Sequence, residues 1–272
     1  MPDARDGAVG GLPDALRPDW PAPPQVRALM STRAGGVSAA PFDSLNLRPA
    51  ALPGADLDDP AAVAENQRRF AKALGAQPVW LNQVHGADVV RLGAAQSAPG
   101  MLPRADASIS TEPGLACTVL VADCLPVLFC SRQGDVVGAA HAGWRGLAGG
   151  VLEATAAAMG EAAGREPADL IAWLGPCIGP GAFEVGADVL AAFGAAPEPR
   201  DQPHFRFALR ADGSPRWRAD LPALARARLH AAGVAAVHGG HWCTFSDASR
   251  FFSFRREPRT GRLAAGIALR GT

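Results

Sequence analysis

Short apolar runs, each interrupted by glycine, proline or aspartate, limit what this chain can fold into more than any other feature. All of them end well before the roughly 18 residues that a membrane-spanning helix needs, so we expect no membrane span. Runs of this length are typical of buried strands and short amphipathic helices. Strand-like and helix-like segments follow one another without a regular βαβ rhythm. This predicts an α+β fold: a single compact domain with mixed β-sheets flanked by helices.

The spacing of apolar residues places the elements along the chain. Strands are expected at residues 26–32, 79–84, 88–92, 107–110, 117–122, 127–130, 136–141, 170–174, 251–255 and 262–269. Helices are expected from the Asp58-Asp59-Pro60 start to Gly75, at residues 147–159 and 185–193, and after the capping residue Asp220. Residues 1–24 are rich in proline and glycine, so we expect a tail or an ordered arm there and the folded domain at residues 25–272.

Length, charge and cysteine content narrow the class of protein. The chain has 272 residues, enough to bury a substantial core without a disulfide or a structural metal. Its 26 basic and 26 acidic residues cancel, which argues against a nucleic-acid-binding protein, because such proteins usually carry a basic excess. The first residues lack the basic and apolar regions of a signal peptide. The five cysteines are therefore expected to be reduced thiols in the cytoplasm.

Three segments are dense in reactive side chains and lie at the ends of expected strands: residues 82–86, 122–126 and 141–146. They contain His85, Cys124 and His141, whose imidazole and thiolate groups are ligands that zinc accepts. Three protein ligands would leave a fourth position open for water or substrate. A histidine or cysteine at a strand end is more often structural. The glycines that flank both histidines, and Asp123 beside the cysteine, favour a functional site here.

A different chemistry would use the same atoms. Cys124 could be a nucleophile with His141 as its base, as in a cysteine hydrolase or amidase. The sequence does not separate a thiolate that binds zinc from one that attacks carbon. The amidase hypothesis leaves His85 without a role.

Two glycine-containing loops carry an arginine suited to an anion. Residues 143–146 precede an expected helix, whose N-terminal N–H groups favour negative charge, and Arg145 would add a fork of donors. Arg33 begins the second loop, at residues 33–36. The alternative for each loop is an ordinary turn with a solvated arginine. No loop matches a nucleotide-binding fingerprint, since neither the Lys-Ser/Thr pair of a phosphate loop nor GxGxxG after a strand is present.

Taken together, these segments resemble the YfiH/YlmD family, the bacterial relatives of the laccase-domain protein of human macrophages. The resemblance extends from Val26 to Leu269. Its motifs lie at residues 31–38, 44–47, 65–66, 82–86, 118–126, 141–146, 174–179, 183–186 and 250–256. Two positions depart from the usual residues: Ser31 stands in place of threonine and Phe254 in place of tyrosine. Neither belongs to the expected ligand set.

The resemblance implies an α/β/β/α-like fold with a zinc site formed by His85, Cys124 and His141. It also implies a purine nucleoside phosphorylase that takes adenosine, inosine, guanosine or methylthioadenosine with phosphate, and that deaminates adenosine. Some members of the family are linked instead to editing of peptidoglycan precursors, where a Cys124/His141 amidase would act.

The matching motifs also suggest roles for individual residues. Cys124, His141 and Asp123 would be catalytic, with Asp123 orienting a ligand or taking a proton. In deamination, zinc would lower the pKa of a bound water to about 7 and place it against purine C6. In phosphorolysis, Arg33 or Arg145 would hold the phosphate that attacks the sugar C1′. The residues expected to bind substrate or phosphate are Arg33, Asn46, Gln83 and Arg145.

The older label of this family, polyphenol oxidase or laccase, agrees poorly with the composition. A multicopper oxidase needs a blue-copper site and a separate copper cluster, and therefore many imidazole ligands. This chain has six histidines and no His-x-His pair. Copper(II) could still replace zinc at a single site, because it binds most nitrogen and sulfur donors more tightly.

Overall fold

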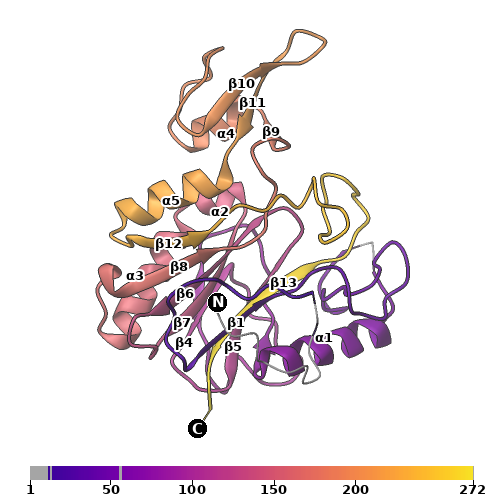
Figure 1. Ribbon diagram of the computed structural model, residues 1–272, viewed down its shortest axis with the longest axis vertical. Helices are drawn as coiled ribbons and strands as arrows, with labels where there is room; N and C mark the ends of the chain where they lie inside the picture. Colours follow the sequence, from indigo (N-terminus) through magenta and orange to yellow (C-terminus); the bar gives the residue numbers. More distant parts are fainter. Residues whose placement is uncertain (1–11, 13, 55–56, 272) are drawn as a thin grey trace, which may run out of the picture.

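Two β-sheets pack face to face at the centre of the molecule, and helices cover the outer face of each (Figure 1). The computed structural model describes residues 12, 14–54 and 57–271. The first sheet has the order β1-β13-β5-β2: Val26–Met30, Leu263–Leu269, Leu115–Val121 and Gln77–Val79. The second has the order β12-β8-β6-β7-β4-β3: Ala236–Gly239, Leu170–Leu174, Leu125–Ser131, Val137–Ala142, Ala107–Ser110 and Val89–Arg91. Each sheet mixes parallel and antiparallel pairs, which confirms the predicted α+β class.

The order of layers is helix, sheet, sheet, helix, and three apolar clusters fill the spaces between them. Strand β5 contributes to two of these clusters, because successive side chains of a strand point to opposite faces of the sheet. Ala116 and Leu120 pack with helix α1 (Pro60–Leu74), whereas Val119 and Val121 face the second sheet. Since both faces are buried, the strands show continuous apolar runs in the sequence.

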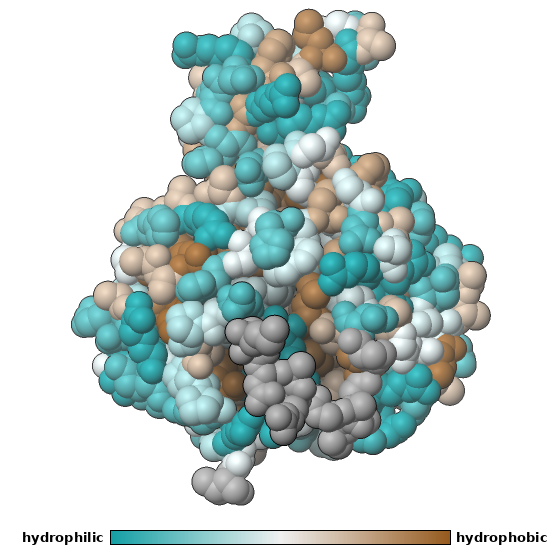
Figure 2. Space-filling view, viewed as in Figure 1, coloured by the Kyte–Doolittle hydropathy of each residue, from teal (hydrophilic) through white to brown (hydrophobic). Residues whose placement is uncertain are grey.

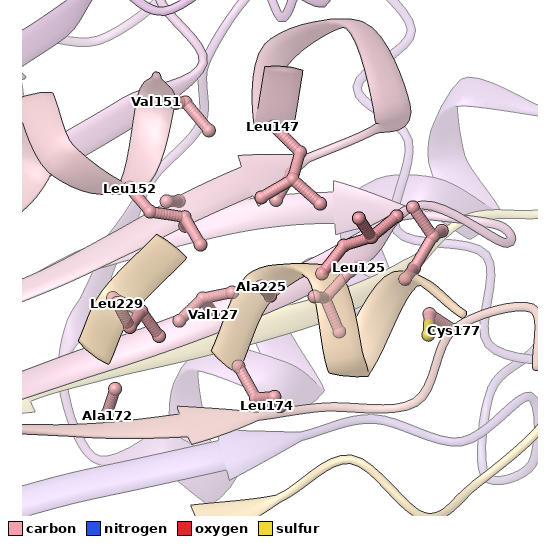
Figure 3. Packing of buried hydrophobic residues seen from close by; sticks show 14 of the residues in the cluster. Leu125, Val127, Leu147, Val151, Leu152, Ala172, Leu174, Cys177, Ala225 and Leu229 are labelled. Carbon is pink, nitrogen blue, oxygen red and sulfur yellow. The ribbon is translucent and has the colours of Figure 1, made fainter. Parts of the chain in front are cut away.

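The third cluster lies between the second sheet and the helices on its outer face (Figure 3). Leu125 and Val127 of β6 and Leu174 of β8 meet side chains of three helices there. These helices are α2 (Trp144–Ala148), α3 (Val151–Ala163) and α5 (Leu221–Ala231). Every helix in the described part of the chain is too short or too polar to cross a lipid bilayer.

A small lobe interrupts the chain between β8 and α5 and stands out from the rest at the top of Figure 1. It contains β9 (Glu184–Val185), α4 (Ala187–Ala192), β10 (Phe205–Leu209) and β11 (Pro215–Ala219), with the sheet order β10-β11-β9. Trp217 anchors the lobe, since this side chain is 1% exposed and belongs to the same apolar cluster as side chains of helices α3 and α5.

A short 3-10 helix, Pro167–Asp169, lies outside the lobe and precedes β8.

The structure corrects several expected elements. The helix expected at residues 147–159 is two helices, because Gly150 adopts φ +93°, a left-handed conformation that ends α2 and begins α3. The segment 251–255 is no strand: the Arg256 side chain donates to the carbonyls of Thr244, Phe245 and Phe251 and folds this segment into turns. The strand expected at residues 79–84 is the shorter β2, which ends at Val79. The helix expected at residues 185–193 is α4, which begins at Ala187 because Val185 belongs to β9. The short strands β10, β11 and β12 were not predicted.

The segment that precedes β1 is an ordered arm over residues 14–24. Leu16 exchanges two backbone hydrogen bonds with Met30, and Trp20 and Ala22 pack against the cluster between the sheets. The expectation of a tail at residues 1–24 otherwise concerns residues 1–11 and 13, which lie outside the described residues. The domain boundary at residue 25 stays a prediction.

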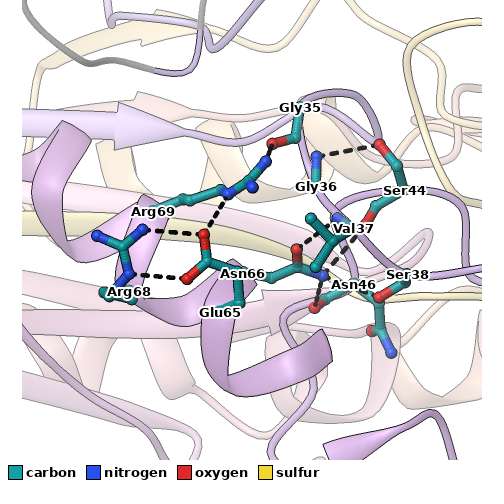
Figure 4. A network of polar contacts seen from close by, with 10 residues as sticks. All are labelled: Gly35, Gly36, Val37, Ser38, Ser44, Asn46, Glu65, Asn66, Arg68 and Arg69. Atoms are coloured by element: carbon teal, nitrogen blue, oxygen red, sulfur yellow. Dashed lines mark hydrogen bonds and ion pairs between the residues drawn. The ribbon is translucent and has the colours of Figure 1, made fainter. Parts of the chain in front are cut away.

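A buried amide on helix α1 organises the loop that follows β1 (Figure 4). Asn66 is 0% exposed; its Oδ1 accepts from the N–H of Val37, and its Nδ2 donates to Ser38 Oγ and to the carbonyls of Ser44 and Asn46. These contacts explain why the sequence motifs at residues 31–38, 44–47 and 65–66 occur together: they fold against one side chain. The loop leads directly to the residues that line the candidate site.

Replacement of this amide tests its importance. Asn66→Ala leaves several buried partners unpaired, so we expect the free energy of unfolding to fall by about 3 kcal/mol. The control on the same helix is Arg68→Ala, because Arg68 is exposed and its ion-pair partner among the described residues is Glu65 on the same helix, so the stability should hardly change. Urea unfolding measures both variants. Equal stability of the two would contradict the role given to Asn66.

Candidate functional site

Cys124 lies where the chain crosses from one sheet to the other. Strand β5 belongs to the first sheet and β6 to the second, and Ala122, Asp123 and Cys124 make the crossing. Asp123 has φ +96°, a conformation that residues other than glycine rarely adopt. Its carboxylate holds the crossing in place: Oδ1 accepts from Thr244 Oγ1 at 2.6 Å and Oδ2 from the N–H of Arg255 at 2.7 Å. The structure thus places Asp123 as a support for the turn that carries Cys124.

His141 lies near the end of β7 and is 3% exposed. Its Nδ1 donates to Asp106 Oδ1 at 2.8 Å, which directs the other ring nitrogen, Nε2, toward the cluster. Asp106 is 0% exposed, and its backbone carbonyl accepts from the N–H of His141. The sequence analysis missed Asp106, although an acidic residue directly before the apolar strand at residues 107–110 was a signal.

The same carboxylate orders the loop that carries His85. The backbone N–H groups of Val84, His85 and Gly86 donate to Asp106 at 3.1, 2.8 and 2.7 Å. These bonds hold His85 at φ +61°. Burial opposes ionisation of Asp106, but the bonds from His141, Gly86 and Val84 outweigh burial and hold its pKa below the usual value. One anionic side chain therefore positions both histidines.

His85, Cys124 and His141 offer three ligand atoms that all lie within 4.8 Å of one another. Cys124 Sγ is 3.8 Å from His85 Nε2, and the two imidazole rings stand edge to face with centroids 4.8 Å apart. His141 is buried, Cys124 half-buried and His85 exposed, so the cluster opens to solvent on one side. Gly143 makes room for it: a Cβ there would lie 3.0 Å from both Cys124 Sγ and His85 Cδ2. Two imidazoles and a thiolate fit a zinc or copper ion.

The charges of this cluster favour a thiolate. Burial opposes ionisation of Cys124, but the charge of His141 and the hydrogen bonds of both histidines outweigh it and lower the pKa of the thiol to about 6. Burial likewise opposes protonation of His141, but the Cys124 thiolate and Asp106 raise its pKa to about 9. Without a metal, Cys124 and His141 therefore form a thiolate–imidazolium pair near pH 7. Metal binding would require His141 to lose its proton.

A cavity of about 410 Å³ opens over the cluster, a size that suits a small molecule. Its wall is apolar along the end of β5, and two arginines and one aromatic side chain complete it. The lining residues are Arg48, Leu52, Pro53, Leu81, Asn82, Gln83, His85, Leu120, Val121, Ala122, Cys124, His141, Phe254 and Arg262.

The structure places the other expected site residues at different distances from this cavity. Gln83 lines it, but its amide pairs with the backbone of Leu120 in both directions, so it fixes the loop to β5. Asn46 is buried behind the lining: its Oδ1 accepts from the N–H groups of Arg48 and Arg262. Asn46 therefore positions the two arginines of the cavity.

Arg33 and Arg145 do not line this cavity. Arg33 donates to the carbonyls of Asp43 and Ala248 and stacks on Phe252, which ties it to the loop scaffold. Arg145 is exposed on α2, with its guanidinium 4.2 Å from the ring centre of Trp144. Reasoning from glycine-containing loops therefore missed Arg48 and Arg262, whose position depends on the packing of segments far apart in the chain.

Alkylation of the metal-free protein tests the charge state of Cys124. Only the thiolate reacts, and its fraction rises with pH. The alkylation rate of Cys124 should therefore reach half its maximum near pH 6. The rate of an ordinary thiol reaches half its maximum at about pH 8.5. Mass spectrometry resolves the individual sites. Buried Cys117 and Cys130, whose pKa values are raised to about 12, are internal controls that stay unlabelled. A midpoint at the ordinary value would refute the thiolate–imidazolium pair.

Asp106→Asn tests the carboxylate that supports both histidines. The amide cannot stabilise a protonated His141, so the alkylation midpoint of Cys124 should move to higher pH. Zinc affinity should fall about 10–100-fold, as is typical when a partner of a ligating histidine is lost. Asp88→Asn, a neighbouring exposed acid, is the control. If both variants bind zinc equally well, Asp106 has no positioning role.

Comparisons with known proteins agree with this architecture. The family model described as multi-copper polyphenol oxidoreductase laccase matches residues 27–270. Purine nucleoside phosphorylase PA4543 of Pseudomonas aeruginosa is 54% identical over 93% of this chain and 98% of its own length. Purine nucleoside phosphorylase YfiH of Escherichia coli K12 is 48% identical over 93% of this chain and 97% of its own length.

Solved structures show the same fold. The crystal structure of Neisseria meningitidis protein NMB0706 has a TM-score of 0.83 and 46% identity, covering 95% of this chain and all (100%) of the other. That of YlmD from Geobacillus stearothermophilus has a TM-score of 0.83 and 30% identity, covering 98% of each. The chain therefore belongs to the laccase-domain family, the YfiH/YlmD family that its motifs predicted.

Proposed function

We propose that this chain is a purine nucleoside phosphorylase whose active site is the cavity over His85, Cys124 and His141. The relatives that bear this name carry the proposal, since they match it over more than nine-tenths of its length at up to 54% identity. The cavity supports it with room for a nucleoside and with two arginines for phosphate. The proposed nucleosides are adenosine, inosine, guanosine and methylthioadenosine.

In phosphorolysis, an oxygen of hydrogen phosphate forms a bond to the sugar C1′ while the bond from C1′ to purine N9 breaks. The electron pair of that bond leaves with the purine, which takes the phosphate proton. The products are the sugar 1-phosphate and the free base. The attacking group is a dianion, so it must be held and oriented close to C1′.

Arg48 and Arg262 are the side chains that we assign to the phosphate, since a guanidinium offers paired donors to its oxygens. Asn46 holds the backbone of both arginines, so their positions depend on each other. The apolar wall at Leu81 and Leu120 would shield the sugar from water. We assign zinc, with copper as a substitute, to His85, Cys124 and His141; a bound metal would supply Lewis acidity at this end of the cavity.

The proposal includes adenosine deamination at the same site. Replacement of the C6 amino group by water gives inosine and ammonia, without any need for phosphate. The two reactions therefore differ in their dependence on the arginines. This difference allows the roles of the cavity residues to be separated in one protein.

Phosphate-dependent release of base is the decisive test. Purified protein with zinc should convert adenosine to adenine only with phosphate, and to inosine without it. Arg262→Ala should raise the KM for phosphate roughly tenfold, which is the loss of about one charged hydrogen bond, and leave deamination nearly unchanged. Arg145→Ala, outside the cavity, is the matched control. If Arg145→Ala raises the phosphate KM and Arg262→Ala does not, the assignment of phosphate to the cavity arginines is wrong.

A polyphenol oxidase mechanism is not proposed. In the described part of the chain, His85, Cys124 and His141 are the one group of three or more His, Cys, Asp or Glu side chains with ligand atoms close enough to share an ion. A multicopper oxidase needs a second copper cluster with its own imidazole ligands. Copper bound at this site would therefore act as a single ion.

One observation favours a second candidate, an amidase that acts on peptidoglycan precursors. Cys124, His141 and Asp106 form a chain of nucleophile, base and orienting carboxylate, with the pKa of the thiol lowered to about 6. This order is that of cysteine hydrolases. The amidase would need a free thiolate, whereas the phosphorylase proposal uses the thiolate as a ligand.

His85→Asn separates the two candidates, because the metal hypothesis makes His85 a ligand, whereas in the amidase it is one of two histidines that stabilise the thiolate. We expect the variant to lose metal and most of its adenosine turnover. Wild type should be protected from alkylation at Cys124 when loaded with zinc, and a chelator should abolish both the protection and the turnover. Adenosine turnover that persists in His85→Asn without metal, with Cys124 readily alkylated, would falsify the zinc proposal and show that the thiolate is free, as the amidase requires.

A further inference from the structure

We propose that a second anion site, for a phosphate group, lies at the base of the small lobe and is formed by Arg210, Arg216 and Arg255. We name these three residues the arginine clasp. They line a cavity of about 690 Å³ that does not share lining residues with the candidate active site. The other lining residues are Glu184, Val185, Gly186, Ala187 and Asp188.

The arginine clasp is assembled from three separate segments. Arg210 follows β10, Arg216 lies in β11, and Arg255 lies in the turns that precede β13. The first two belong to the lobe and the third to the body, so the cavity lies where these parts meet (Figure 1). Hydrophilic side chains cover much of the lobe in the view of Figure 2.

One carboxylate at the cavity is already neutralised. Glu184 accepts from Arg210 Nε at 2.7 Å, and its other oxygen lies 3.7 Å from Arg218, outside the clasp. The hydrogen bond from Arg210 and the charges of the neighbouring arginines hold the pKa of Glu184 below its usual value. Glu184 therefore has both oxygens committed to Arg210 and Arg218.

Arg216 and Arg255 have no such partner. Arg216 donates to the carbonyl of Pro215, and Arg255 donates to the backbone carbonyl of Glu184 and stacks on Phe183. Within residues 57–271, neither guanidinium is in ion-pair contact with a carboxylate, including the exposed Asp188 on the rim and Asp212 at the hairpin tip, which accepts from Ser214. Three arginines and two acidic residues, Glu184 and Asp188, line the cavity, so its lining is net positive and favours an anionic ligand.

The geometry of the donors favours phosphate over a carboxylate. Arg216 and Arg255 each present a planar fork of N–H groups from a different segment of the chain, and Arg210, paired with Glu184, adds a third positive charge beside them. A phosphate group has enough oxygens to accept from both forks at once, whereas a carboxylate has two. Inorganic phosphate and a phosphate monoester share this chemistry. This inference does not depend on the proposed function.

Arg255 also touches the catalytic turn, which decides how the site is tested. Its backbone N–H donates to Asp123 Oδ2, next to Cys124. That bond survives a change of side chain, but the Arg255 guanidinium also stacks on buried Phe183, so Arg255→Ala would alter packing as well as charge. In the described part of the chain, the Arg216 side chain donates to the carbonyl of its neighbour Pro215 and makes no hydrogen bond to the turn that carries Cys124, so Arg216→Ala probes the clasp.

Titration calorimetry with inorganic phosphate on the full chain tests the proposal. Wild type should bind phosphate at the clasp, and Arg216→Ala should weaken that site roughly tenfold, since one charged hydrogen-bond donor is lost. Arg206→Ala is the control: it lies on the neighbouring strand β10, is exposed, does not line the cavity, and removes the same charge. Thermal unfolding should show that both variants remain folded.

Phosphate affinity that is equal in Arg216→Ala and Arg206→Ala overturns the inference, whether both keep the wild-type affinity or both lose it. Arg262→Ala removes only the phosphate bound for phosphorolysis, so Arg216-dependent binding must persist in it. A protein that binds phosphate at the clasp but does not cleave adenosine contradicts the proposed function alone. Ribose 5-phosphate as a second probe separates the sources: tighter binding than inorganic phosphate indicates a monoester, and weaker binding indicates the free ion.

Discussion

The buried carboxylate of Asp106 is the interaction on which the candidate site depends. It receives the N–H groups of three successive residues, Val84, His85 and Gly86, and the Nδ1 proton of His141. Without it, the loop after β2 would lose its anchor and His141 its fixed tautomer. A buried charge is costly unless it is fully hydrogen-bonded, and here four donors satisfy it. The same bonds that stabilise the carboxylate therefore bring two imidazoles from separate elements to one place.

The third member of the cluster depends on the contact between the sheets. Strands β5 and β6 are consecutive in the chain but belong to different sheets, so the short crossing between them must turn sharply. Asp123 takes the left-handed conformation that this turn needs, and Thr244 and Arg255 hold its carboxylate. Cys124 is carried to the histidines by this crossing. The cluster therefore lies where the two sheets meet, and the cavity opens at the end of β5.

Much of the fold could be predicted because local patterns specify it. Asp59, Pro60 and Gly75 mark the ends of α1, and the apolar runs at residues 107–110 and 170–174 are strands β4 and β8 with the predicted bounds. The errors occur where tertiary contacts override local preference. Arg256 turns an apolar, aromatic segment into a non-strand by binding three backbone carbonyls. The hairpin β10–β11 was missed because its short strands are stabilised by packing around Trp217.

The sequence by itself determined the family and picked out a candidate ligand set, since His85, Cys124 and His141 lie in the motifs that specify the family. It did not determine which arginines share their cavity, since Arg33 and Arg145 resemble anion-binding residues locally but lie outside it. Arg48 and Arg262 are separated by more than two hundred residues and are brought together by the side chain of Asn46. Local patterns reflect conformational preference and burial, which act between near neighbours. The convergence of distant residues depends on how the layers pack, and only the tertiary structure decides it.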